Sequence, residues 1–416
     1  MLLILRINVR IDEVLDILLS RAEPQERETF ARMDEHSGGA FRLSVLLCEC
    51  LRILEDYLNR TGDFSRSASL RAIFPFGARP SPWLSRLNSL LRGLSYESLY
   101  FPPASARGEE RVAQIWSAVV AHISRDETIA NPPLQAIHFP PRTHRQRHIE
   151  PVTEEMSRPF QALPDEVLAF GYHGSIGSND HVHWLSDCDA VIFLRAGVVG
   201  DARRLRKIRP AFMEARRMMK RIDRFQHHGV YVIPEELLST FPGDYFPPIL
   251  LRTSSFDVGG NTNLSAHIIT SRWFNLVRTL GSSRYLANEA TRLGRYNYHM
   301  FHFILQLAQL LPCWVVACCE RSMNKREAIP WLSERVSNKS RAFLTLTTKI
   351  RENWGEIWTR CTAGLGPVTL VREHNLKEET TRFFGGGAKL AEGLQSLARD
   401  CPAIAREALR RPMNGG

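Results

Sequence analysis

Asp187 and Asp189 are separated by one residue and are followed at once by the apolar run 190–194. Side chains alternate between the two faces of a strand, so both carboxylates would point one way and Cys188 the other. Two carboxylates on one edge repel each other unless a positive group lies between them. Oxygen ligands of this kind suit Mg²⁺ or Mn²⁺, which in proteins usually take one or two carboxylates together with phosphate oxygens. The pair therefore predicts a divalent-cation site that also receives phosphate.

A Gly-Ser pair, Gly174 and Ser175, follows the apolar run 167–170 and precedes the aspartates by the segment 176–186. Glycine lets a ligand approach the backbone closely, and serine offers a hydroxyl and an N–H. A helix that began near Ser175 would add free N–H groups, which favour an anion such as a triphosphate. The two pairs together predict a pocket for a nucleoside triphosphate and its cation.

This order of residues over 170–194 resembles the signature of the nucleotidyltransferase (DNA polymerase β-like) superfamily, in particular its bacterial members with small substrates. The resemblance implies an enzyme that uses Mg²⁺ or Mn²⁺. Asp187 and Asp189 would bind the metal and be catalytic, and Gly174 and Ser175 would hold the triphosphate. The implied reaction transfers a nucleoside monophosphate from the triphosphate to a hydroxyl-type acceptor and releases pyrophosphate. The acceptor stays open among a small molecule, a protein and RNA.

Members of that superfamily commonly carry a third acidic residue on a neighbouring strand, where it completes the metal site. The segment 226–233 is predicted to be that strand, but its interior contains no acid. His227 and His228 could approach the site instead, because a histidine can act as a general base near neutral pH. The nearest acids flank the strand, at Asp223, Glu235 and Glu236. This departure keeps a second interpretation open, a nucleotide-binding regulatory protein that is catalytically weak or inactive.

The segment 201–224 contains ten Lys or Arg and three acids, with apolar residues at three-to-four spacing. The spacing predicts an amphipathic helix, or two helices divided at Pro210, with the apolar stripe on the sheet. The basic side would face RNA, a phosphorylated substrate or water. The net charge of +10 and the pI near 9.4 likewise favour acidic partners such as nucleotides and nucleic acid. RNA-end modification is therefore a further alternative.

A chain of 416 residues with 44% hydrophobic and 24% charged residues is expected to form two or three globular domains. We predict an α+β fold, with a small mixed nucleotidyltransferase sheet and flanking helices between two mainly helical regions. The predicted division is 1–130 (mainly helical), 131–151 (linker rich in Pro and basic residues), 152–258 (catalytic core) and 259–416 (helical domain).

The C-terminal region shows repeated helical spacing of apolar residues. The predicted helices cover 264–280, 284–293, 296–320, 325–336, 339–357 and 388–409. In the superfamily, such a domain closes the cleft and supplies a lysine to the triphosphate. Lys325, at the start of a predicted helix, is the candidate by position.

The cysteines show no paired Cys-x-x-Cys spacing, which favours free thiols in a reducing cytoplasm. The apolar stretch 1–9 is short and contains Arg6, so it does not predict a signal peptide. The most apolar helix, 300–319, carries His302 and is interrupted by Pro312, so we expect a buried helix and no membrane span. Nothing in the sequence predicts the oligomeric state.

Overall fold

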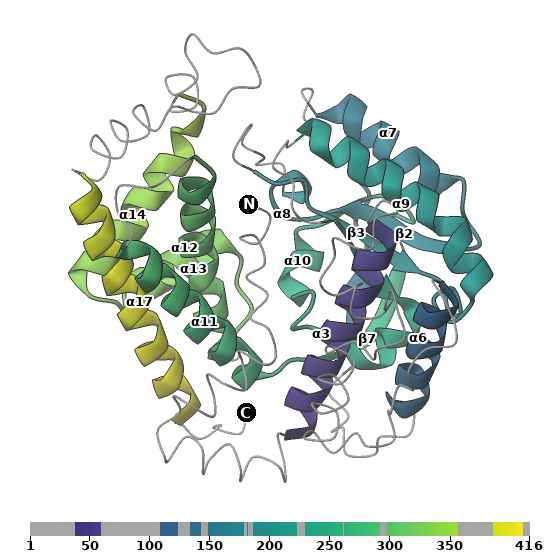
Figure 1. Ribbon diagram of the computed structural model, residues 1–416, viewed down its shortest axis with the longest axis horizontal. Helices are drawn as coiled ribbons and strands as arrows, with labels where there is room; N and C mark the ends of the chain where they lie inside the picture. Colours follow the sequence, from purple (N-terminus) through teal and green to yellow (C-terminus); the bar gives the residue numbers. More distant parts are fainter. Residues whose placement is uncertain are drawn as a thin grey trace, which may run out of the picture. The chain divides into compact units, whose positions relative to one another are not determined.

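The computed structural model describes residues 38–59, 109–123, 134–142, 149–178, 181, 186–222, 229–260, 262–291, 298–319, 321–356 and 386–410. Over these residues the protein is α+β, with two small sheets, flanking helices and a C-terminal group of helices, which confirms the predicted fold class (Figure 1). The described residues form two compact units. We name them the α/β unit, 38–181 with 186–270, and the helical unit, 271–410.

The larger sheet of the α/β unit has four strands in the order β4-β3-β2-β6. Strand β2 (Val167–Tyr172) is antiparallel to both β3 (Ala190–Leu194) and β6 (Ser255–Val258). Strand β4 (Val230–Pro234) is parallel to β3. Parallel neighbours need a crossover connection, and α9 (Ala202–Ile222) provides it. Every residue of β3 is buried, so the strand that follows the two aspartates is fixed in the core.

Helices α7 (Glu150–Gln161) and α9 pack together on one face of this sheet (Figure 1). The ring of Phe160 lies 4.4 Å from that of Phe170 in β2 and 5.3 Å from that of Phe212 in α9. The predicted amphipathic helix is confirmed, and it continues through Pro210 without dividing. Its buried stripe includes Leu205, Ile208, Phe212, Ala215, Met219 and Ile222.

The opposite face of the sheet packs against a three-stranded sheet of order β1-β7-β5. It consists of β1 (Leu134–His138), β7 (Asn263–Ile269) and β5 (Phe241–Pro242). Phe139, which follows β1, lies with its ring 4.5 Å from the rings of both Phe193 and Phe256. The short helices η3 (Glu235–Thr240), α10 (Pro248–Arg252) and α8 (Gly174–Gly177) complete the unit.

This arrangement corrects two predictions made from local pattern. The stretch 131–151 is not merely a linker, because β1 pairs with β7 and Phe139 is completely buried. The helix predicted over 264–280 is wrong in its first part, because 263–269 forms β7 and α11 begins after the cap residue Ser271. The compact unit therefore extends to residue 270, and the predicted boundary at 258 falls inside it.

Two N-terminal helices, α3 (Gly38–Asn59) and α6 (Glu109–Ile123), belong to the α/β unit and pack on α9. The side chain of Asn59 covers the outer edge of β4. Its Oδ1 accepts a hydrogen bond from the Val230 N–H (2.9 Å), and its Nδ2 donates to the Val230 carbonyl (3.1 Å). The Tyr245 hydroxyl accepts from the Val232 N–H (3.2 Å) and donates to Glu55 of α3 (3.2 Å). Side chains thus take the place of a further strand on this edge.

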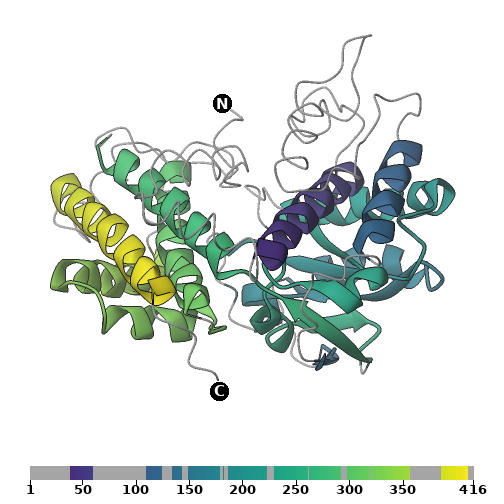
Figure 2. The same ribbon diagram turned by 90° about the horizontal axis from the view of Figure 1, so that it is seen from below.

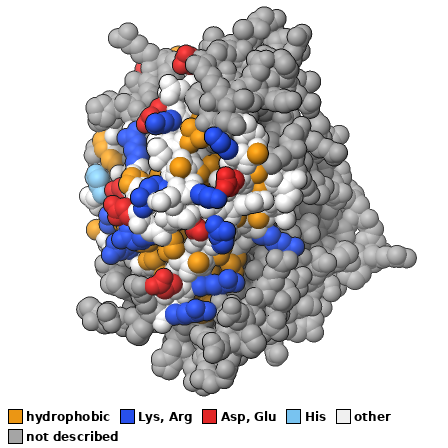
Figure 3. Space-filling view, turned by 90° about the vertical axis from the view of Figure 1, so that its left-hand side faces the viewer, with side chains coloured by type: hydrophobic (Ala, Val, Ile, Leu, Met, Phe, Trp, Pro, Cys, Tyr) orange, Lys and Arg blue, Asp and Glu red, His pale blue; other side chains and the backbone are white. Residues whose placement is uncertain are grey.

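The helical unit contains α11 (Arg272–Ala290), α12 (Tyr298–Cys318), α13 (Lys325–Ser333), α14 (Asn338–Glu352) and α17 (Gly387–Arg410). Helix α17 packs on α11, α12 and α14 (Figure 2). Gly393 permits a close approach, since a Cβ there would lie 2.4 Å from the ring of Phe343 in α14. On the face that Figure 3 shows, Lys and Arg side chains are spread among hydrophobic ones.

Most of the helices predicted for this region are confirmed, although 284–290, predicted as the start of a separate helix, continues α11. Among the described residues, no helix has the length and apolarity that crossing a bilayer requires. The described cysteines form no disulfide, and most of them are buried.

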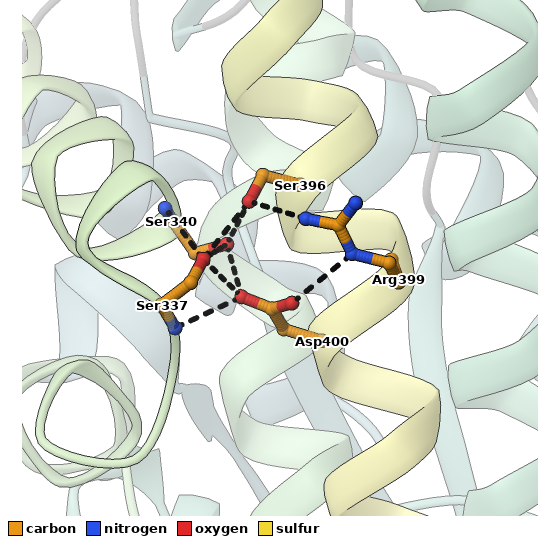
Figure 4. Close-up of polar contacts among 5 residues, drawn as sticks. All are labelled: Ser337, Ser340, Ser396, Arg399 and Asp400. Atoms are coloured by element: carbon orange, nitrogen blue, oxygen red, sulfur yellow. Dashed lines mark hydrogen bonds and ion pairs between the residues drawn. The ribbon is translucent and has the colours of Figure 1, made fainter.

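A polar cluster joins α14 to α17 (Figure 4). The Asp400 Oδ2 accepts hydrogen bonds from the Ser337 N–H (3.0 Å), the Ser337 hydroxyl (2.6 Å) and the Ser340 hydroxyl (2.7 Å). The hydroxyl oxygens of Ser340 and Ser396 lie 3.0 Å apart. Although burial by itself raises the pKa of Asp400, the hydrogen bonds from Ser337 and Ser340 outweigh it and lower the pKa below its usual value.

We expect Asp400→Asn to lower the free energy of unfolding at pH 7 by about 1–3 kcal/mol, because the serine donors lose a charged acceptor. With the folded pKa below the unfolded value of about 3.9, the carboxylate stabilises the protein above that pH. This contribution is lost as the pH falls through the folded pKa. Urea unfolding of the two proteins should therefore converge below about pH 4. A gap that stays constant down to pH 3 would contradict the assignment, and Glu407→Gln on the same helix is the control.

Candidate functional site

Four of the predicted site residues, Gly174, Ser175, Asp187 and Asp189, lie where β2 ends and β3 begins. The backbone N–H of His173 donates to the Asp189 carbonyl at 3.1 Å. This bond extends the antiparallel ladder, in which Tyr172 is in register with Ala190, by one further pair. The glycine turn after β2 and the aspartate before β3 are therefore neighbours in space.

The backbone of Gly174 lies so close to the Asp189 carboxylate that a residue with a side chain would not fit at position 174. Gly174 has a φ of +60°, and a Cβ built on it would lie 2.7 Å from the Asp189 Oδ2. Such a backbone conformation favours glycine, and the absence of a Cβ lets the Asp189 carboxylate lie against the backbone of the turn. A cation bound by that carboxylate would therefore also lie next to the turn.

Asp187 and Asp189 are both half-buried, whereas Cys188 between them is completely buried. This alternation agrees with the predicted orientation of the two carboxylates to one side. The aspartates precede the strand, however, because β3 begins at Ala190. They consequently stand at the rim of the sheet, and each side chain is partly exposed to solvent.

Ser175 lies in α8, a single turn of helix, and is half-buried. The prediction of a helix near Ser175 holds, but a helix of one turn has a weak dipole. The turn is braced internally, since the Ser178 hydroxyl donates to the Gly174 carbonyl at 2.7 Å. A phosphate bound at this turn would therefore interact mainly with the Ser175 hydroxyl and the backbone N–H groups, and the helix dipole would contribute little.

From the neighbouring strand, β4 presents Tyr231 on the same face of the sheet as Asp189. Tyr231 is in register with Val191, which follows Asp189 by two residues. Its ring lies 5.2 Å from the His173 ring and 5.8 Å from that of Phe246. On this face β4 thus presents an aromatic side chain, and not an acid, two residues beyond the level of Asp189.

Glu235 and Glu236 do not supply the third acid. Their carboxylates accept hydrogen bonds from the backbone N–H groups of Ala196 (2.9 Å) and Gly197 (2.7 Å), which follow β3. Since Asp189 precedes β3, these glutamates lie at the other end of the strand. His227, His228 and Asp223 lie outside the described residues. Among the described residues, no group of three or more His, Cys, Asp or Glu could hold a metal ion.

Lys325 belongs to the helical unit, whereas the aspartates and the glycine turn belong to the α/β unit. It is the first residue of α13, as predicted, and its Nζ donates to the Gln306 Oε1 at 3.3 Å. This contact ties α13 to α12. A contact of Lys325 with the triphosphate stays a prediction.

The donors gathered at the rim fit Mg²⁺ or Mn²⁺. Asp187, Asp189 and Ser175 offer hard oxygen atoms, and the Asp189 carboxylate lies directly against the backbone of the Gly174 turn. Two protein carboxylates are what magnesium sites commonly use, with phosphate oxygens and water supplying the remaining ligands. The residues therefore suit a cation that arrives with a triphosphate.

The basic side of α9 is largely engaged within the α/β unit. Arg206 pairs with Glu109 of α6, Lys207 with Glu166 at 2.8 Å, and Arg221 with Glu155 of α7. The Arg209 guanidinium lies 4.9 Å from the Tyr57 ring centroid, and Arg216 donates to the Asn59 carbonyl. These contacts hold α3, α6 and α7 around α9, which weakens the interpretation of this helix as an RNA-binding element.

Sequence reasoning missed Tyr231 and Asn59. The alternation of the strand places Tyr231 on one face, but its ring partners come from His173 and from the separate segment 245–246. Asn59 ends a long helix, and nothing local indicates that its amide pairs with a strand far along the chain.

No protein-family model, curated protein or solved structure matches the chain.

Proposed function

We propose that the protein transfers a nucleoside monophosphate from a nucleoside triphosphate to a hydroxyl-type acceptor and releases pyrophosphate. The observation that carries the proposal is the closeness of Gly174 to the Asp189 carboxylate, at the rim where Asp187 and Ser175 also lie. This combination offers phosphate-binding backbone, a hydroxyl and two carboxylates in one place.

In the proposed reaction, Asp187 and Asp189 hold Mg²⁺ or Mn²⁺, and Gly174 and Ser175 hold the β- and γ-phosphates. When bound, the divalent ion neutralises triphosphate charge and lowers the pKa of the acceptor hydroxyl. The acceptor oxygen forms a bond to the α-phosphorus, the bond from that phosphorus to the bridging oxygen breaks, and pyrophosphate leaves with the electron pair. The protein mainly positions the reactants. The base that receives the acceptor proton stays a prediction, with His227 and His228 as candidates.

The test is incubation of the full chain with each labelled nucleoside triphosphate, Mg²⁺ or Mn²⁺ and a cell extract. We expect pyrophosphate release together with label on one class of acceptor, and the chemical nature of the labelled molecule identifies that class. Failure of all four triphosphates to yield pyrophosphate with either metal would overturn the proposal.

A second candidate function is nucleotide binding with little or no turnover, as in a regulatory protein. Tyr231 favours it, because β4 presents this aromatic residue, and not a third carboxylate, on the face of the sheet that carries Asp189. The protein would then bind the triphosphate without releasing pyrophosphate, and this binding would be its function.

If this second candidate is right, Tyr231→Asp should raise Mg²⁺-dependent pyrophosphate release by about tenfold or more, since one added metal-bound charge contributes at least about 1.4 kcal/mol. Tyr231→Asn removes the same ring without adding charge and should leave the rate unchanged. Purified variants are compared under identical conditions in a coupled pyrophosphate assay. A wild-type protein that turns over rapidly, and that slows in both variants, would exclude the second candidate.

A further inference from the structure

The turn α8 ends with a second glycine, Gly177. A Cβ built on Gly177 would lie 2.4 Å from the Thr253 carbonyl oxygen and 2.6 Å from the Tyr172 carbonyl oxygen. Both oxygens belong to the backbone, so no side chain can rotate away to make room. Gly174 has a positive φ, whereas Gly177 does not. The need for glycine at 177 therefore comes from the close approach of two backbone segments alone.

The backbone on the far side of this contact is firmly held. Tyr172 is the last residue of β2, it is completely buried, and it is in register with both β3 and β6. Thr253 follows α10, and its N–H donates to the Leu250 carbonyl at 3.2 Å. The next residue, Ser254, is buried, and its N–H donates to the Leu251 carbonyl at 3.3 Å. An added methyl group at the contact would therefore displace the turn and not its support.

The turn is short and internally bonded, so a displacement at one end reaches the other. The Gly177 N–H donates to the His173 carbonyl at 3.3 Å, and the Ser178 N–H donates to the Gly174 carbonyl at 3.0 Å. Ser175 lies between these bonds, in the same turn. A shift of Gly177 consequently shifts the residues that are proposed to hold the phosphates.

The size of this shift matters for a reaction. The contact of 2.4 Å with the Thr253 oxygen would have to lengthen by about 1 Å to reach 3.4 Å, where ordinary van der Waals contacts begin. A misplacement of about 1 Å between reacting groups can lower a rate by a factor of about 100. Asp187 and Asp189 belong to a separate segment, in front of β3, so the carboxylates would stay in place while the turn moves.

We infer that Gly177 is a positioning residue for the triphosphate. It contacts no reactant, but it lets the α8 turn lie directly against the carbonyls of Tyr172 and Thr253. The place of the turn in turn sets how far the β- and γ-phosphates lie from the cation at Asp187 and Asp189. The inference rests on the proposed transfer reaction and deepens it, because it assigns the support of the phosphate site to the backbone that joins α10 to β6.

The experiment measures pyrophosphate release by the full chain with Mg²⁺ and each of the four nucleoside triphosphates, for the wild type and Gly177→Ala. The matched control is Gly259→Ala, whose Cβ would lie 2.3 Å from the Leu168 carbonyl oxygen. This clash is as severe, but it lies near the start of β2, about 13 Å along the strand from Tyr172. Urea unfolding gives the stability that each variant loses.

We expect Gly177→Ala to lower kcat about a hundredfold and to raise KM by less than about tenfold, because the triphosphate still binds through its cation. Gly259→Ala should keep the wild-type kcat although it loses at least as much stability, since its φ of +68° adds backbone strain to the clash. A role of Gly177 in stability alone would make the two variants alike.

A milder pair of variants covers the case in which Gly177→Ala does not fold. Ile176 in the turn and Ile137 in β1 are equally buried, with 4% of each exposed. Replacing isoleucine by valine is among the mildest changes in a core. Ile176→Val loosens the turn and should lower kcat by a smaller factor than Gly177→Ala, whereas Ile137→Val should leave kcat unchanged.

The outcomes separate this inference from the reaction on which it rests. A wild type that releases no pyrophosphate with any triphosphate would overturn both. An active wild type whose kcat is kept in Gly177→Ala, or falls equally in both glycine variants, would overturn the inference alone. Equal kcat in Ile176→Val and Ile137→Val would do the same.

Discussion

The double substitution Asp187→Asn/Asp189→Asn is expected to lower Mg²⁺-dependent pyrophosphate release by about a thousandfold or more. Asn keeps the size of the side chain but removes the charge that holds the cation, and metal-borne charge stabilisation contributes several kcal/mol to such reactions. Folding should be preserved, because two carboxylates at one rim repel each other and their removal relieves that repulsion. Pyrophosphate release by the purified protein with its preferred triphosphate is the measurement.

The matched control for this experiment is Asp165→Asn/Glu154→Gln, which removes two exposed acidic charges from the same unit. It should retain the wild-type rate, because both side chains are exposed and neither belongs to the turn at Gly174. Unchanged turnover in the Asp187/Asp189 variant would show that the carboxylate pair has no part in the reaction. Equal loss in both variants would point to a general effect of charge.

Gly174→Ala is expected to weaken binding of the metal-triphosphate complex by about tenfold or more. The backbone at φ +60° costs an L side chain about 1–2 kcal/mol, and the new methyl group would lie 2.7 Å from the Asp189 Oδ2. The carboxylate must therefore move away from the backbone of the turn. Since 1.4 kcal/mol corresponds to a factor of ten in affinity, calorimetric titration with each triphosphate resolves the effect.

Gly197→Ala is the control for backbone strain. Gly197 has a φ of +75°, but the nearest atom to its added Cβ is the Arg204 Nη1, at 3.7 Å. Both variants should lose comparable stability in urea unfolding, while Gly197→Ala keeps its affinity for nucleotide. Equal nucleotide affinity in the two variants would contradict the assignment of the Gly174 turn to the triphosphate.

Local pattern was sufficient to predict most of the helices and the central strands β2, β3 and β4. The apolar residues of α9 recur at spacings of three and four, which predicts the helix. The apolar run before Gly174 predicts β2, and the apolar run after Asp187 predicts β3. Pairings between distant segments could not be read in this way. Strands β1 and β7 form one ladder although His138 and its partner Asn263 are 125 residues apart, and each segment by itself suggests a linker or a helix.

The charges of α9 illustrate the same limit. A count of ten basic residues over 201–224 suggests a free cationic surface. Their partners Glu109, Glu155 and Glu166 are distributed over two other helices and a turn, so the neutralisation becomes visible only in three dimensions. For the site, sequence spacing indicated the aspartates and the glycine turn, whereas the position of Tyr231 beside them depends on the register of β4.

The amide of Asn59 has a practical consequence for anyone who wishes to produce the α/β unit alone. Strand β4 is the last strand of its sheet, and α3 contributes the side chain that bonds to both backbone groups of Val230. A shortened protein that starts after α3 would leave those groups available to the strands of other molecules. Such a fragment would self-associate through open sheet edges, so truncation boundaries belong upstream of Gly38.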